Sequence, residues 1–201
     1  MTTVQQITTS RQDVQITLPN HLILGGNKGT TIEQFFDAAQ AQHLFTFDAT
    51  PMGAVVDGKL RELNYIVNKD AIVKPVTLAD SDGGRIYRRS LVLLLTAAIE
   101  QLWSGVQVNV SYAVRDGGFY CELSNREPFT VEEIDKIDAK MREMVVEDIA
   151  ITKRVISTAD AIKLFSERGN TDKVRLLTYR TQETLTLYSL AQQDDYYFSY
   201  M

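Results

Sequence analysis

Residues that could act as nucleophiles, bases or metal ligands are few in this chain. It has one cysteine, Cys121, and two histidines, His21 and His43. A serine or cysteine nucleophile needs a base within hydrogen-bonding reach, but Cys121 falls on an expected strand and both histidines are distant in sequence. One cysteine forms no internal disulfide, and the histidines lack neighbours at metal-ligand spacing. We therefore predict no catalytic residue and no metal site, a core-packing role for Cys121, and surface or satisfied-core roles for the histidines.

A glycine-rich segment, Gly25 to Thr30, invites comparison with phosphate-binding loops. A P-loop requires GxxxxGK followed by Ser or Thr, between a strand and the helix that it opens. No segment of the sequence meets that requirement. Because glycines also supply the positive φ angles of turns, we predict that these are turn glycines.

A tight basic cluster, Arg85, Arg88 and Arg89, stands at the start of an expected helix. The N-terminal end of a helix favours negative charge, so three cations there indicate an anionic group nearby. Two candidates for this anionic group remain open: Asp80 or Asp82 of the preceding segment, in a salt bridge, or a bound phosphate or RNA. The three arginines are our candidate ligand-binding residues.

The elements that position these residues must fit into 201 residues, which allows one large domain or two small ones. Hydrophobic residues make up 44% and charged residues 23% of the chain, as in ordinary globular proteins. The formal net charge of −5 gives no general attraction for nucleic acid, so any such contact must be local. No apolar run approaches the ~20 residues that cross a bilayer, and the first 12 residues lack the features of a secretory signal. We predict a cytoplasmic protein without membrane contact.

The first domain is expected at residues 13–79, after an N-terminal tail at 1–12 and before a polar, glycine-containing linker at 80–84. Alternating apolar residues predict a hairpin, and a capping box from Thr31 to Gln34 predicts a helix to about Gln42. Further strands are expected at residues 54–56, 60–66 and 71–78. Pro75 places the last of these strands at an edge or a bulge. The order predicts a small β-grasp sheet on one helix.

The second domain is expected at residues 85–201 and is also α+β. Apolar residues at steps of three and four predict a helix at 85–103. Strands follow at 106–110 and 119–123, joined by the turn Asp116-Gly117-Gly118. A capping box at Thr130 and a cap at Ser157 start two more helices, and a late strand is expected at 185–190.

The end of the chain is unusually bulky, with Tyr196, Tyr197, Phe198, Tyr200 and Met201 among the last six residues. Natural termini are usually polar and frayed. Either the tail docks as a buried strand, or the chain is a piece cut from a longer polypeptide within this domain. We favour the second interpretation, which makes the second domain truncated at its C-terminus.

Several strings resemble the N-terminal region of threonyl-tRNA synthetases. Residues 14–19, 56–63 and 68–70 are similar to a TGS domain, the β-grasp module of these enzymes. Residues 86–90, 98–103, 117–120 and 130–135 are similar to the second additional domain, which performs editing. The resemblance implies a β-grasp (TGS, ubiquitin-like) domain followed by an α+β editing-like domain.

This sequence differs from that family at the residues expected to carry out editing. The resemblance implies an HxxxH motif on the first helix of the editing domain, but the matching positions here are Arg89 and Leu93. A later CxxxH motif would begin near Tyr200, where the chain has no cysteine. Without imidazole or thiolate groups there, neither metal-activated water nor general-base deacylation has its residues.

The sequence also resembles a second family, and this resemblance accounts for the missing editing residues. Residues 85–91, 118–123, 172–177 and 195–198 resemble a group of bacterial uridine kinases, or nucleoside kinases, of the phosphoribulokinase/uridine kinase family. These proteins carry the same domain pair ahead of a P-loop kinase domain. The resemblance implies a C-terminal kinase domain as partner in the same polypeptide, with ATP and magnesium as its cofactors.

Three functions follow as hypotheses. The leading one is a non-catalytic regulatory or recognition region of a uridine kinase, in which the degenerate pocket binds a nucleotide or a tRNA end. The alternatives are an RNA-binding TGS protein without a kinase, and an aminoacyl-tRNA deacylase of threonyl-tRNA synthetase type.

Overall fold

The computed structural model describes residues 12–114 and 118–201, which form two compact units. Unit 1 comprises Met1–Arg88 with Tyr200–Met201, and unit 2 comprises Arg89–Ser199. The expected tail, up to residue 11, and most of the turn at Asp116-Gly117-Gly118 lie outside the described residues. No helix in the described ranges is long and apolar enough to span a membrane.

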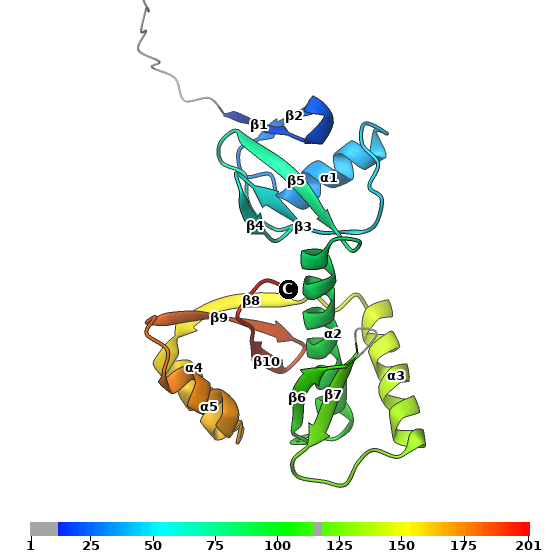
Figure 1. Ribbon diagram of the computed structural model, residues 1–201, viewed down its shortest axis with the longest axis vertical. Helices are drawn as coiled ribbons and strands as arrows, with labels where there is room; N and C mark the ends of the chain where they lie inside the picture. The colour runs from blue at the N-terminus through cyan, green and yellow to red at the C-terminus, as the bar shows by residue number, and fades with distance from the viewer. Residues whose placement is uncertain (1–11, 115–117) are drawn as a thin grey trace, which may run out of the picture. The chain divides into compact units, whose positions relative to one another are not determined.

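Unit 1 is a five-stranded sheet of order β2-β1-β5-β3-β4 with one helix against it (Figure 1). Its strands are β1 (Asp13–Thr17), β2 (Ile23–Asn27), β3 (Pro51–Val56), β4 (Lys59–Arg61) and β5 (Ala71–Thr77), and its helix is α1 (Ile32–Ala41). Strands β1 and β5 run parallel, while β1/β2, β3/β5 and β3/β4 are antiparallel. Alternate β1 residues Val14 and Ile16 are fully buried in the same core as Phe35 and Phe36 of α1. The predicted β-grasp fold is confirmed.

The helix cap and the exposed histidines of unit 1 agree with the predictions from the sequence. The Thr31 side chain accepts a hydrogen bond from Gln34 N, and the Gln34 side chain accepts one from Thr31 N, which completes the capping box of α1. A 3-10 turn, η1 (Pro19–His21), links β1 to β2. His21 and His43 are both exposed and both have positive φ angles, as the surface role predicts.

Strand β5 has neighbours on both sides and is not an edge strand of the sheet, but Pro75 itself lies at an edge position, which is one of the two expected alternatives. Strand β5 sits between β1 and β3. Its pairing with β1 involves only Ala71 and Ile72, whereas its pairing with β3 continues to Thr77. Pro75 is therefore beyond the end of β1, where a missing N–H removes no ladder hydrogen bond on that side.

Helix α2 (Ser81–Leu102) begins earlier than expected, because the segment 80–84 is largely its first turn instead of a linker. The Asp80 carboxylate accepts hydrogen bonds from Thr77 N at 2.7 Å and Thr77 Oγ1 at 3.2 Å. Gly83 is buried directly against the Thr77 carbonyl group. The glycine allows the helix to approach the end of β5 closely, which a local sequence pattern does not reveal.

Unit 2 contains a three-stranded sheet of order β10-β9-β8, a two-stranded sheet β6-β7 and four helical segments (Figure 1). Beyond the α2 residues, its elements are β6 (Val108–Ala113), β7 (Phe119–Leu123), α3 (Val131–Val146), β8 (Thr152–Ser157), α4 (Thr158–Glu167), α5 (Thr171–Thr178), β9 (Thr184–Leu190) and β10 (Gln193–Tyr196). The caps at Thr130 and Ser157 are confirmed. Strands β8 and β10 and helix α5 were not predicted from the sequence. Both units are α+β, as expected.

The core of unit 2 lies where α4 and α5 meet the three-stranded sheet. Its buried members are Ala161, Phe165, Leu177, Leu185 and Leu187. The chain end belongs partly to this unit, because Tyr196 closes β10 and the Tyr197 ring stands edge-on to Tyr188 with centroids 6.3 Å apart. Phe198, by contrast, is 93% exposed.

Candidate functional site

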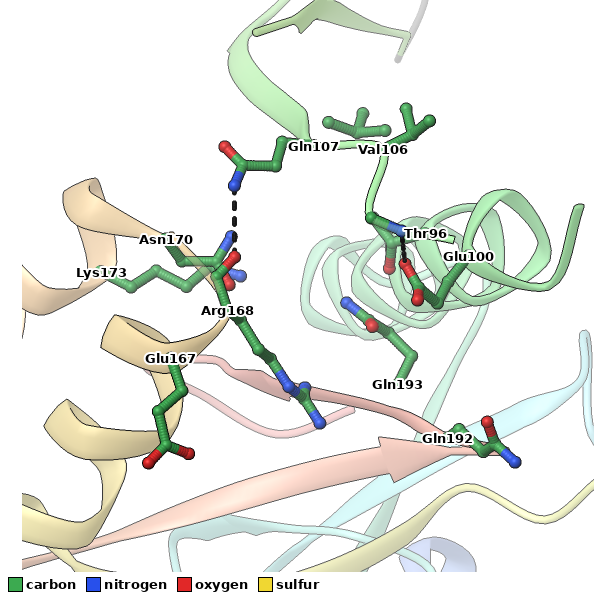
Figure 2. A pocket seen from close by; sticks show the side chains of 12 residues that line it. Thr96, Glu100, Val106, Gln107, Glu167, Arg168, Asn170, Lys173, Gln192 and Gln193 are labelled. Atoms are coloured by element: carbon green, nitrogen blue, oxygen red, sulfur yellow. Dashed lines mark hydrogen bonds between the residues drawn. The ribbon is translucent and has the colours of Figure 1, made fainter. Parts of the chain in front are cut away.

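A polar pocket of about 340 Å³ opens in unit 2 where four segments converge (Figure 2). Helix α2 contributes Thr96 and Glu100, and the following loop contributes residues 105–108. The α4–α5 connection and the segment where β9 turns into β10 supply the remaining residues: Glu167, Arg168, Asn170, Lys173, Gln192 and Gln193. Carboxamide and charged side chains dominate this lining, so the pocket suits a polar ligand.

A glycine and a carboxylate shape the wall formed by the loop. The Glu100 carboxylate accepts hydrogen bonds from Ser104 Oγ at 2.8 Å and from Gly105 N at 3.0 Å. Gly105 has a φ of 80°, which an L side chain rarely adopts. On the opposite wall, Gln107 Nε2 donates to the Arg168 carbonyl at 3.2 Å. This bond ties the loop to the end of α4, as the dashed line in Figure 2 shows.

Arg168 is held by a buried aspartate on β10. The Asp194 carboxylate accepts from Arg168 at 3.0 Å and from Arg154 at 2.9 Å, and Ser189 Oγ also donates to it. Burial alone would raise the pKa of Asp194, but the hydrogen bonds from Ser189 and Arg154, with the charges of Arg154 and Arg168, outweigh burial and lower that pKa. Asp194 is therefore an anion that neutralises the pocket's arginine.

Lys173 is held by the next residue of β10. Its Nζ donates to Asp195 Oδ1 at 2.6 Å and lies 5.3 Å from the centroid of the Phe165 ring. The Asp195 side chain is only 8% exposed. Burial, followed by the nearby charge of Asp195, raises the pKa of Tyr197. The tyrosine is therefore a neutral phenol at physiological pH and supplies no base.

The predicted arginine cluster does not line this pocket. Arg85 is largely exposed and pairs with Asp82 at 3.0 Å, which is the salt-bridge alternative for that residue. Arg88 and Arg89 are half-buried. In an α-helix, residues three, four and seven apart share a face, so Arg89 lies on the face of α2 that carries Thr96 and Glu100. The rise of 1.5 Å per residue puts Arg89 about 10 Å along the helix from Thr96.

A second, more apolar cleft of about 730 Å³ lies between α2, the β6-β7 ribbon and α3. Leu95, Phe129 and Ile137 are among its lining residues, together with Cys121. The prediction that Cys121 packs in the core is wrong: a two-stranded ribbon buries little of either strand, and this side chain is exposed. Partial burial raises the pKa of the Cys121 thiol, so it is not an activated nucleophile.

Neither cavity could be found from sequence periodicity. The polar pocket unites residues from Thr96 to Gln193 that approach one another only through tertiary packing. The one local signal is the pair of adjacent acids, Asp194 and Asp195, in an otherwise uncharged tail. Within the described ranges, no three His, Cys, Asp or Glu side chains cluster closely enough to hold a metal ion.

Comparison with known proteins finds similarity to threonine–tRNA ligases. The chain is 34% identical to the Clostridium kluyveri enzyme over 145 residues, which are 72% of this chain and 22% of that protein. It is 34% identical to the Thiobacillus denitrificans enzyme over 122 residues, or 61% of this chain and 19% of that protein. The Gluconobacter oxydans enzyme is 33% identical over 165 residues, which cover 81% of this chain and 24% of that protein.

The chain thus spans about a fifth to a quarter of the length of these curated relatives. No family model matches the sequence. The threonyl-tRNA synthetase-like part of the expected resemblance is confirmed, and it covers most of the chain.

Proposed function

We propose that this chain is a non-catalytic recognition region of a longer protein, and that the polar pocket of unit 2 is its ligand site. The observation that carries the proposal is the lining itself: carboxamides and charged side chains from four segments, with no imidazole or thiolate among them. The ligand is a nucleotide-like small molecule or the end of an RNA.

The substitutions at Arg89 and Leu93 support a role without chemistry. Leu93 is fully buried and apolar, so it offers neither a proton nor a lone pair. Arg89 is a permanent cation with a planar fork that can grip a phosphate or carboxylate in bidentate fashion. It shares a helix face with two pocket residues, so a ligand that extends about 10 Å from the pocket along α2 would reach it.

We further propose that the parent polypeptide is a uridine or nucleoside kinase. Its P-loop domain, with ATP and magnesium, would follow this region as the covalent partner. The support is the resemblance of residues 85–91, 118–123, 172–177 and 195–198 to those kinases. The full reading frame tests this: a GxxxxGK[ST] motif downstream of residue 201 supports the kinase, and a stop codon directly after that residue contradicts it.

Titration of the protein with uridine, adenosine, ATP and a short RNA ending in CCA tests the ligand site. We expect at least one of these probes to bind, and Lys173→Ala to weaken that binding about tenfold or more, because the substitution also leaves the buried Asp195 unpaired. If none of these probes binds, the pocket is not a site for this class of ligand and the proposal is wrong.

The arginine cluster is tested in the same titration with Arg85→Ala, Arg88→Ala and Arg89→Ala. We expect Arg89→Ala to weaken RNA binding about tenfold, as is typical for loss of a charged hydrogen bond. Arg142→Ala is the matched control, since Arg142 pairs with Asp138 on the exposed side of α3. If none of the three substitutions changes the RNA affinity, the arginines do not contact the RNA.

A further inference from the structure

We infer that the polar pocket of unit 2 selects an uncharged ligand group with a hydrogen-bond donor and acceptor side by side, and disfavours the phosphorylated form of the same ligand. This inference rests on the proposed function, because it specifies the ligand class of the same pocket. It follows from which polar groups of the lining are already engaged and which remain unpaired.

Three carboxamides of the lining are unpaired. Within the described part of the chain, the side chains of Asn170, Gln192 and Gln193 have no hydrogen-bond partner, and Asn170 stands at the start of α5 without capping it. Figure 2 shows Gln193 between Glu100 and Arg168, with its amide directed into the pocket. Each carboxamide offers one acceptor oxygen and two N–H donors. Such a group pairs in bidentate fashion with an amide or with the edge of a nucleobase.

The cations of the lining, by contrast, are already engaged. Arg168 donates to Asp194 at 3.0 Å, and Lys173 donates to Asp195 at 2.6 Å. Both aspartates are buried, so these pairs are weakly screened by solvent. An added phosphate would have to compete with these two carboxylates for the same two cations.

Glu100 adds a negative charge to the same wall. Its oxygens accept from Ser104 Oγ and Gly105 N, and no cation pairs with it among the described residues. A phosphate in the pocket would therefore meet the negative charge of Glu100 and would also have to compete with Asp194 and Asp195 for Arg168 and Lys173. A neutral group meets the free carboxamides without this repulsion.

The test compares matched pairs of probes at constant ionic strength: uridine with uridine monophosphate, and adenosine with adenosine monophosphate. Calorimetry on the full 201-residue chain should show at least one nucleoside binding about tenfold or more tightly than its monophosphate. Gln193→Glu and Asn170→Asp keep side-chain shape but remove the amide donors, and each should weaken nucleoside binding about tenfold. Gln101→Glu, on an exposed part of α2 outside the pocket, is the charge-matched control.

The outcomes separate this inference from the proposed function. A monophosphate that binds as tightly as its nucleoside, or more tightly, overturns the inference and leaves a ligand site in place. If neither Gln193→Glu nor Asn170→Asp changes the nucleoside affinity, the inference is also overturned, because the carboxamides then do not contact the ligand. If neither the nucleosides, the monophosphates nor the CCA-ended RNA binds, the proposed function and the inference are both wrong.

Discussion

Replacing Gly83 by alanine should destabilise the protein by about 3 kcal/mol or more, because an added methyl group has no space. A Cβ atom at this position would lie 2.6 Å from the Thr77 carbonyl carbon and closer still to its oxygen. Both atoms belong to the backbone at the end of β5, so no side-chain rotation relieves the overlap. Helix α2 or strand β5 must shift.

The neighbouring glycine provides the control. A Cβ on Gly84 would meet only the Leu78 carbonyl oxygen at 4.0 Å, an ordinary contact. In a helix, exchange of glycine for alanine is usually stabilising by about 0.5–1 kcal/mol. Urea unfolding of Gly83→Ala and Gly84→Ala should therefore give midpoints that move in opposite directions. Equal midpoints would contradict the close approach of α2 to β5.

Replacing Asp194 by alanine should destabilise unit 2 by about 2–3 kcal/mol, since removing one partner of a buried ion pair leaves unmet charge. The loss of stability should be smaller than for a fully buried pair, because the Arg154 side chain is 51% exposed and water can solvate its unpaired charge. Asp138→Ala is the control: it breaks the exposed pair with Arg142 and should change stability by less than about 1 kcal/mol.

The pH dependence of this effect has a definite sign. The pKa of Asp194 is lower in the folded state than its ordinary value. A depressed carboxyl pKa contributes stability that is complete above the unfolded pKa, near 4, and is lost as the pH falls through the folded pKa. The difference in unfolding free energy between wild type and Asp194→Ala should therefore shrink below about pH 4. A difference that stays constant from pH 7 to pH 3 would contradict an ionised, stabilising Asp194.

Much of the fold could be predicted because its signals are local. Alternation in β1 and the capping boxes at Thr31 and Thr130 depend on residues within one turn or strand, and the structure shows each of them. Gly83 and Gly84 misled the prediction for the opposite reason. The pair resembles a loop locally, but Gly83 is required by a contact with Thr77, six residues earlier.

The candidate site was largely beyond prediction. The arginines predicted from their type and place at a helix start do not line the pocket, and its residues Asn170, Gln107 and Gln193 carry no distinguishing pattern in the sequence. Their common location depends on α4, α5 and β10 packing around one core. Cys121 was misplaced because its alternation predicts a buried strand, and only the ribbon's lack of a third strand exposes it.

The central claim is recognition without chemistry, and the lifetime of an aminoacyl-tRNA ester in the presence of excess protein tests it most directly. By the resemblance described above, Arg89 and Leu93 stand at the positions where an editing domain is expected to carry histidines. We expect the ester to decay at its spontaneous rate at every protein concentration. Acceleration that is proportional to protein concentration and lost in a folded Lys173→Ala or Arg89→Ala variant would contradict it.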